Sequence, residues 1–324
     1  MISTNDFLLG ALLPAVVAAV AMAAAWQLTR CATVAWLAGF VLGYLSGHWG
    51  LDARGTGLES LGAAIVEAVA KSFRPHEARD WMPCILVLMA MPEEIMLFGK
   101  RSQLAAWPMR AAASGFLGWR LLSLHKNYPT SELVQAGLND SAWSWAQVTA
   151  AIAGIAATVL LLWRLSLAAK DQPAPVCRTL LTILVATGGA AMLALSGSLT
   201  IGQLMGVAAA ALGGCGAAAL LLRVGQGPEA APAPLIAVMG GLWLLAYLFI
   251  EGGVTLTQVA LLVASLAAAL SALPLTKVWQ IGFRSAACLV PLAIAVAMAA
   301  SDFAATQSIP ETKPAANPYQ NWQP

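Results

Sequence analysis

Repeated apolar stretches of about 20 residues constrain the fold of this chain more than any other feature. A stretch of that length, wound as an α-helix, crosses the hydrocarbon core of a bilayer. Only 10% of the 324 residues are charged, against about 25% in a soluble domain. We therefore expect an all-α, polytopic transmembrane helix bundle with about ten spans, at 7–26, 32–49, 81–99, 103–124, 144–164, 178–196, 200–222, 233–251, 255–274 and 281–301.

The distribution of Lys and Arg predicts the orientation of these spans, because cations favour the cytoplasmic side. The turns at 196–200 and 251–255 hold no cation, whereas the odd-numbered spans end in Arg30, Lys100 with Arg101, Arg164, Arg223 and Lys277. We expect a protein of the cytoplasmic (inner) membrane with both termini outside. The first apolar run lacks the preceding cations of a signal peptide, so it is expected to be a retained span, with cleavage as the alternative.

Three regions are predicted along the chain. Residues 1–126 form an N-terminal membrane region with spans 1–4, which includes an amphipathic interfacial segment at 50–80. Residues 127–302 form a C-terminal membrane region with spans 5–10, and the Pro-, Gln- and Asn-rich residues 303–324 are an expected disordered tail.

The C-terminal region contains an internal repeat. The segments SWAQV, TIGQL and TLTQV recur at intervals of about 55 residues, long enough for two spans, which suggests tandem helical hairpins. Ser or Thr followed three positions later by Gln is a capping box, in which both side chains bond to free backbone N–H groups. We expect three helix caps, with lining of a common polar pathway by the glutamines as the alternative: Ser144 with Gln147, Thr200 with Gln203, and Thr255 with Gln258.

Helix packing is predicted by a ridge of glycines in the second span. Gly39, Gly43 and Gly47 recur every four residues, so they share one helix face and let another backbone approach closely. The five cysteines are far apart and mostly lie in apolar segments, where they are expected to be packing residues rather than a disulfide or zinc site.

The segment between the second and third spans holds a weak candidate for chemistry at the outer interface. His76 and Asp80 are spaced as two metal ligands on a helix, with Glu77 beside them as a base. A zincin would need a second histidine where Asp80 stands, and the whole chain has three histidines. An interfacial turn in which Asp80 caps the third span is the favoured interpretation, and no metal and no cofactor is predicted.

Two adjacent carboxylates, Glu93 and Glu94, lie within the apolar run AMPEEIML of the third span. Arg110 in the fourth span is expected at a similar depth, because the short connection makes the two helices antiparallel neighbours. One arginine neutralises one carboxylate, so the other is the main candidate for function. Pro92 leaves two alternatives open: a continuous third span, or a helix broken at this proline, as in many transporter sites.

Ionisable residues are scarce in the second half of the chain. The apolar spans between 178 and 301 contain essentially none, so we expect any chemistry to lie at 50–126 or in the outer loops. His48 and His125 fall near span ends and are expected to face the membrane–water boundary.

Three functions are compatible with this sequence. The favoured one is a non-enzymatic scaffold or assembly component, whose partners are the lipid bilayer and another membrane protein. The second is a small-solute or ion transporter that uses Glu93 and Glu94. Ten spans in an Ala-rich chain of this size are similar to the drug/metabolite transporter superfamily, although the inverted five-plus-five symmetry of that superfamily is not visible. An intramembrane enzyme ranks last, and the net charge of +2 does not indicate nucleic-acid binding.

Overall fold

The computed structural model describes residues 7–53, 61–73, 75, 77–95, 102–137, 139–169, 175–250, 253–271 and 278–307. Within this part of the chain every regular element is helical. Ten longer helices coincide with the ten apolar stretches, and the α-helices are α2 (Leu13–Thr29), α3 (Ala32–Asp52), α4 (Leu61–Phe73), α5 (Met82–Ile95), α6 (Ser102–Ser123), α7 (Glu132–Gln135), α8 (Trp145–Ala169), α9 (Pro175–Leu195), α10 (Leu199–Leu221), α11 (Pro232–Phe249), α12 (Leu256–Leu270) and α13 (Val278–Gln307). Three further turns are the π-helical η1 (Leu8–Leu12) and the 3-10 turns η2 (Ala78–Trp81) and η4 (Pro228–Ala230).

Six of the described helices are long and apolar enough to cross a membrane: η1 with α2, α8, α9, α10, α11 and α13. This indicates a multi-pass membrane protein. The remaining helices in the apolar stretches are α3 and α6, which are long but less apolar, and α5 and α12, which are shorter over their described residues. A count of ten spans therefore stays a prediction.

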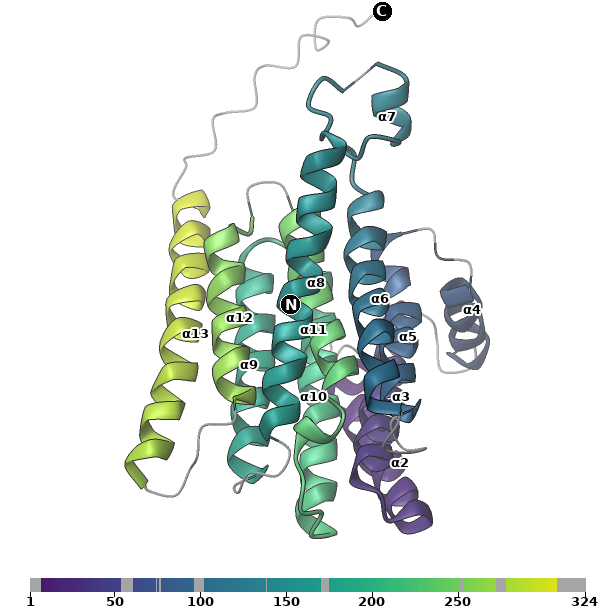
Figure 1. Ribbon diagram of the computed structural model, residues 1–324, viewed down its shortest axis with the longest axis vertical. Coiled ribbons are helices and arrows are strands. Elements are labelled where there is room, and N and C mark those ends of the chain that lie inside the picture. Colours follow the sequence, from purple (N-terminus) through teal and green to yellow (C-terminus); the bar gives the residue numbers. More distant parts are fainter. Residues whose placement is uncertain are drawn as a thin grey trace, which may run out of the picture.

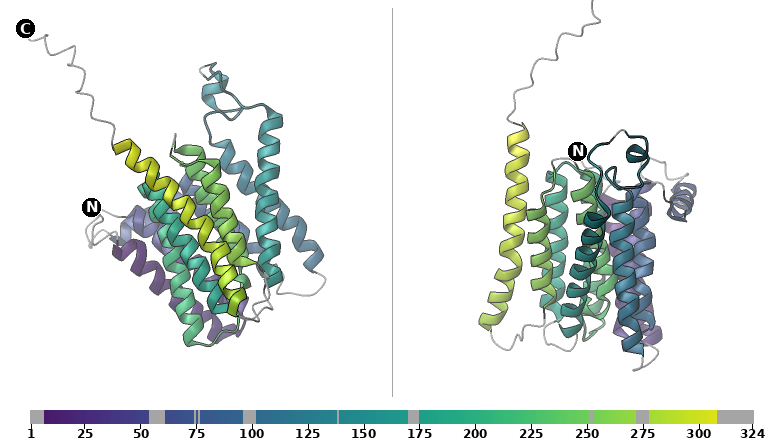
Figure 2. Two further views of the ribbon diagram at one scale, coloured as in Figure 1. Left: turned by 90° about the vertical axis from the view of Figure 1, so that its left-hand side faces the viewer. Right: turned by 45° about the horizontal axis from the view of Figure 1, so that its top comes forward.

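The helices of the N-terminal and C-terminal regions pack into one bundle (Figure 1). Helix α10 packs against α2, α3 and α9, while α11 packs against α5, α6 and α8. Helix α13 lies along α12 and α9 at one side of the bundle, and the short helix α4 lies at the opposite side (Figure 2). Helix α11 is buried along almost all of its length, so the core of the molecule surrounds it.

The glycine ridge of α3 lies where this helix packs closely against α2 and α10. A Cβ atom on Gly39 would lie 2.8 Å from Met22 Cβ of α2, and one on Gly43 would lie 2.6 Å from Ala18 Cβ. A Cβ on Gly47 would lie 2.5 Å from Val207 Cγ1 of α10. Since real Cβ atoms do not approach so closely, these glycines allow α2, α3 and α10 to pack backbone to backbone.

Because consecutive helices alternate in direction, the bundle has two ends, each named here after one acidic residue. The Asp52 end holds the C-terminus of α3, turn η2 and the N-terminus of α10. The Glu229 end holds the N-termini of α9, α11 and α13, and turn η4. Helix α3 runs from one end to the other, over about 24 Å between Trp36 and Asp52 at 1.5 Å per residue.

Candidate functional site

The arginine of the expected intramembrane charge site is buried between aromatic rings. Arg110 is 1% exposed, and its guanidinium carbon lies 5.0 Å from the ring centroid of Trp107 and 4.8 Å from that of Trp163. Helices α5 and α6 pack against each other, as the short connection predicts. The described part of α5 is continuous through Pro92 to Ile95. The side chains of Glu93 and Glu94 lie outside the described part of the chain, so their pairing with Arg110 stays a prediction.

The candidate metal site of the outer interface is organised as a turn over its described residues. Glu77 is the N-cap of η2, and its backbone N–H donates to Asp80 Oδ2 at 3.0 Å. Arg79 Nε lies 2.8 Å from Glu77 Oε2 and 3.8 Å from Asp80 Oδ1. His76 lies outside the described residues. Among the described residues no group of three His, Cys, Asp or Glu side chains is placed to hold a metal ion.

Reciprocal capping bonds are present at two of the three repeated motifs. Ser144 N–H donates to Gln147 Oε1 at 2.8 Å, and Gln147 N–H donates to Ser144 Oγ at 3.3 Å. Thr255 and Gln258 form the same pair of bonds at 2.8 and 3.3 Å. The three glutamines do not share one environment: Gln147 is exposed, Gln203 lines a small pocket, and Gln258 is buried beside Asp302.

The expected cap at Thr200 is wrong, because α10 begins two residues earlier than the motif indicates. Its N-cap is Ser198, whose Oγ accepts from the Ile201 N–H at 3.3 Å. Thr200 is therefore inside the first turn of the helix. A Ser at the preceding cap position competes for the same backbone N–H groups, and the sequence SGSLTIGQ offers both choices.

A buried ion pair at the Glu229 end lies outside residues 50–126, and its arginine comes from the predicted span 178–196, although the apolar spans between 178 and 301 were expected to contain essentially no ionisable residue. Arg178 Nη2 on α9 lies 2.6 Å from Glu229 Oε1, and the two side chains are 1% and 0% exposed. Glu229 Oε1 also accepts the Gly227 N–H at 2.9 Å. Turn η4 is thus folded into the bundle rather than lying on its surface, and Pro228, Glu229 and Ala230 are all buried.

A second buried arginine lies near this pair. Arg284 on α13 is 0% exposed, and it donates to the carbonyl oxygens of Ala268 and Ala269 at the C-terminal end of α12. It therefore neutralises helix carbonyls that have no partner within α12 itself. Arg284 is also within electrostatic range of Arg178 and Glu229, so three buried charges from three separate segments lie at this end.

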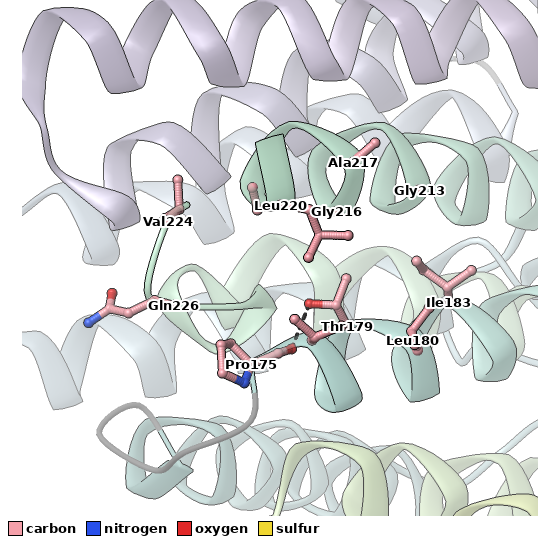
Figure 3. A pocket seen from close by; sticks show the side chains of 12 residues that line it. Pro175, Thr179, Leu180, Ile183, Gly213, Gly216, Ala217, Leu220, Val224 and Gln226 are labelled. Carbon is pink, nitrogen blue, oxygen red and sulfur yellow. Dashed lines mark hydrogen bonds between the residues drawn. The ribbon is translucent and has the colours of Figure 1, made fainter. Parts of the chain in front are cut away.

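Beside the ion pair, a cavity of about 260 Å³ opens between α9 and α10 (Figure 3). The Thr179 side chain lies at this cavity, and its hydroxyl donates to the Pro175 carbonyl at 2.9 Å. Most of the remaining wall is apolar, and Gly213 and Gly216 make room for the space. A Cβ on Gly227 would lie 2.7 Å from Glu229 Oε2 and 3.0 Å from the Pro175 oxygen. The backbone at Gly227 is therefore packed too closely against these groups to accommodate a larger residue.

The Asp52 end contains a different kind of charged site, a pocket of about 160 Å³ with mainly polar side chains. Asp52 comes from α3, Arg79 from η2, and Thr200 and Gln203 from α10. Behind it, His48 Nε2 lies 4.0 Å from Asp52 Oδ2, and the His48 side chain is only 2% exposed. The expectation that His48 faces the membrane–water boundary is therefore wrong. Its ring lies inside the bundle, next to Tyr44 at a ring-centroid distance of 5.9 Å.

One face of α3 runs between the two ends and carries polar side chains toward each of them. Tyr44 and His48 are fully buried, and Tyr44 Oη and His48 Nδ1 have no hydrogen-bond partner among the described residues. At the other end of α3, the Trp36 indole N–H donates to the Gln226 carbonyl at 2.9 Å, next to the turn that carries Glu229. Residues 36, 40, 44, 48 and 52 follow one another at intervals of four, so sequence periodicity alone could have found this face.

Comparisons with protein-family models, with curated proteins and with solved structures found no match. The interpretation of these sites therefore depends on their geometry.

Proposed function

We propose that this protein is a ten-span transporter of a small solute or ion in the cytoplasmic membrane, with both termini outside. The observation that supports the proposal is the contrast between the ends of α3. A polar pocket with partly exposed charges lies at the Asp52 end, and a dry ion pair lies at the Glu229 end. A carrier that exposes its site to one side at a time needs one open end and one closed end.

The burial of ionisable groups also favours transport over a passive scaffold. Charged and polar groups inside a membrane bundle are costly, and they usually mark substrate or ion pathways. His48, Asp52 and Tyr44 follow one helix face into the bundle, where apolar side chains would pack at lower cost. In this proposal Glu93, Glu94 and Arg110 form a second charge site, and Glu94→Gln is expected to lower transport without unfolding the protein.

Uptake by proteoliposomes tests the proposal. Purified protein is reconstituted and given labelled methylammonium, acetate or alanine, which represent a cation, an anion and a zwitterion. We expect uptake of at least one solute above that of protein-free liposomes, and a decrease of about tenfold or more for Asp52→Asn, since hydrogen bonds to charged groups contribute about 1.5–3 kcal/mol. Glu67→Gln is the control, because Glu67 is 70% exposed and pairs with Lys71 on α4, outside the pocket. Equal uptake by both variants would contradict the role of Asp52, and an absence of uptake for all three solutes would contradict the proposal for these classes.

A scaffold or assembly component is the second candidate function, and one observation favours it. An apolar groove of about 500 Å³ is lined by residues of α6, α8, α11 and α12. A transmembrane helix of another membrane protein could pack into such a groove, since small residues such as Gly154 and Gly240 line it. A Cβ on Gly154 would meet no atom within 4 Å, so Gly154→Leu fills the groove at little cost to the fold. The scaffold function predicts that Gly154→Leu dissociates a membrane complex seen by native mass spectrometry. The transport function predicts that the same variant keeps its uptake in proteoliposomes.

A further inference from the structure

The pocket at the Asp52 end has walls of opposite charge. Six residues from three segments line its volume of about 160 Å³: Leu51, Asp52, Arg79, Thr200, Gln203 and Leu204. A water molecule in the liquid takes about 30 Å³, so the pocket has room for a small solute of several non-hydrogen atoms.

The negative wall is the Asp52 carboxylate. Its side chain is 20% exposed, and the imidazole Nε2 of the buried His48 lies 4.0 Å from Asp52 Oδ2. That distance is too long for a hydrogen bond. The structure records no hydrogen bond to Asp52 Oδ1 or Oδ2 from the described residues. The carboxylate therefore keeps its acceptor sites for a ligand that carries N–H donors.

The positive wall is the Arg79 guanidinium. Its Nε lies 2.8 Å from Glu77 Oε2 and 3.8 Å from Asp80 Oδ1, which are ion-pair contacts within turn η2. Arginine carries five N–H donors. Among the described residues the recorded ion-pair contacts of Arg79 are at Nε, so its two terminal nitrogens are the donors proposed to meet a ligand. Two parallel N–H groups of this kind match a carboxylate in a bidentate pair.

From this arrangement we propose that the pocket binds a small zwitterion, an amino-acid-like solute whose ammonium group contacts Asp52 and whose carboxylate contacts Arg79. Thr200 and Gln203 of α10 complete the polar lining of the pocket. A simple metal cation fits less well, because Arg79 shares the pocket. A simple anion fits less well, because Asp52 does. The inference deepens the proposed function by naming the substrate class, and its claim about transport rests on that function.

Binding to the purified full-length protein in detergent tests the site without transport. The probes are glycine, alanine and β-alanine, with methylammonium and acetate as half-ligands, and binding is measured by calorimetry. We expect at least one zwitterion to bind about tenfold or more tightly than either half-ligand, because each lacks one charged pair. Asp52→Asn and Arg79→Gln should each weaken that binding about tenfold or more. Lys71→Gln, which removes a surface charge on α4 outside the pocket, should leave it unchanged.

Each other outcome overturns a defined part of the inference. Methylammonium that binds as tightly as alanine, and equally to Arg79→Gln, would show a cation site in place of a zwitterion site. Acetate that binds as tightly as alanine, and equally to Asp52→Asn, would show an anion site. No heat from any zwitterion would overturn the site itself. Zwitterion binding that depends on both residues, without uptake in proteoliposomes, would keep the site and overturn only the transport function.

Discussion

The two ends of the bundle differ in how far their charged side chains are buried. At the Glu229 end an arginine and a glutamate lie 2.6 Å apart with almost no exposed surface, and a turn between two prolines carries the acid into the bundle. At the Asp52 end the charged side chains of Asp52 and Arg79 are 20% and 36% exposed and line a small cavity. The same kinds of side chain therefore have different roles: a dry pair joins helices, whereas a partly hydrated group stays available to a ligand.

The physical basis of the difference is desolvation. A buried charge that loses its partner cannot recover its hydration, so the Glu229 end depends on both members of its pair. A charge with solvent access is screened and contributes little to stability, so substitutions at the Asp52 end should change binding more than folding. Substitutions at the two ends can therefore be ranked by their effect on the free energy of unfolding.

The largest loss of stability is expected from breaking the buried pair. Glu229→Ala leaves Arg178 buried without its carboxylate, which costs about 3–5 kcal/mol. Unfolding of the purified protein in mixed detergent micelles measures it. The double variant Arg178→Met, Glu229→Ala should recover most of the loss, since an apolar pair needs no hydration. Glu67→Ala, which breaks the exposed pair with Lys71, is the matched control and should cost about 0.5 kcal/mol or less. Equal losses at Glu229 and Glu67 would refute the contrast between dry and hydrated charge.

A smaller loss is expected from disturbing the close contact between α2 and α10. A Cβ on Gly214 of α10 would overlap the Ala15 carbonyl oxygen of α2, so Gly214→Ala must push the helices apart at a cost of about 1–3 kcal/mol. Gly206 lies on the same helix, and a Cβ there would meet no atom within 4 Å. Gly206→Ala should therefore stabilise α10 by about 0.5–1 kcal/mol. The same unfolding assay gives both values, and equal effects would contradict the close packing of α2 and α10.

Much of this fold could be predicted from the sequence because the determining signals are local. Apolar stretches of the length of a bilayer span become helices whatever their neighbours are, and each of the ten stretches coincides with a helix. The glycine spacing on α3 likewise predicts a close helix contact without naming the partner. Helix starts are less certain, as the two-residue shift from Thr200 to Ser198 illustrates.

The charged sites were harder to predict, because their residues come together only in the folded chain. PEAAPAP has the composition of a surface loop, yet Arg178 and Trp36, from distant helices, draw this segment inward. An arginine within an apolar span, such as Arg284, was the sequence feature that could have indicated a buried charged site, because a buried cation requires hydrogen-bond acceptors or an anionic partner. The pocket at Asp52 likewise combines residues near 52, 79 and 200, and no motif connects them.

Two substitutions at the N-terminus of α10 distinguish a residue that stabilises the helix, Ser198, from one that lines the pocket, Thr200. Ser198→Ala removes the side chain that accepts the Ile201 N–H, and it should cost about 1 kcal/mol. Thr200→Ala leaves that cap in place and should cost less, although Thr200 lines the pocket. Unfolding measurements on the two variants check the order. The reverse order would restore Thr200 as the cap that its repeat motif predicts.

A small effect on stability is also expected at Asp52, the residue with the largest expected effect on binding. Asp52→Asn removes a charge that is 20% exposed and 4.0 Å from His48, so the free energy of unfolding should change by about 1 kcal/mol or less. The shape of the side chain is kept, which leaves the packing of α3 intact. A loss as large as that of Glu229→Ala, measured in the same detergent, would show that Asp52 is a structural partner of His48. If Asp52→Asn loses little stability but no longer binds a zwitterion, the two ends have different roles. The partly hydrated carboxylate of Asp52 would then exchange water for a ligand, whereas the buried pair at the Glu229 end would stabilise the fold.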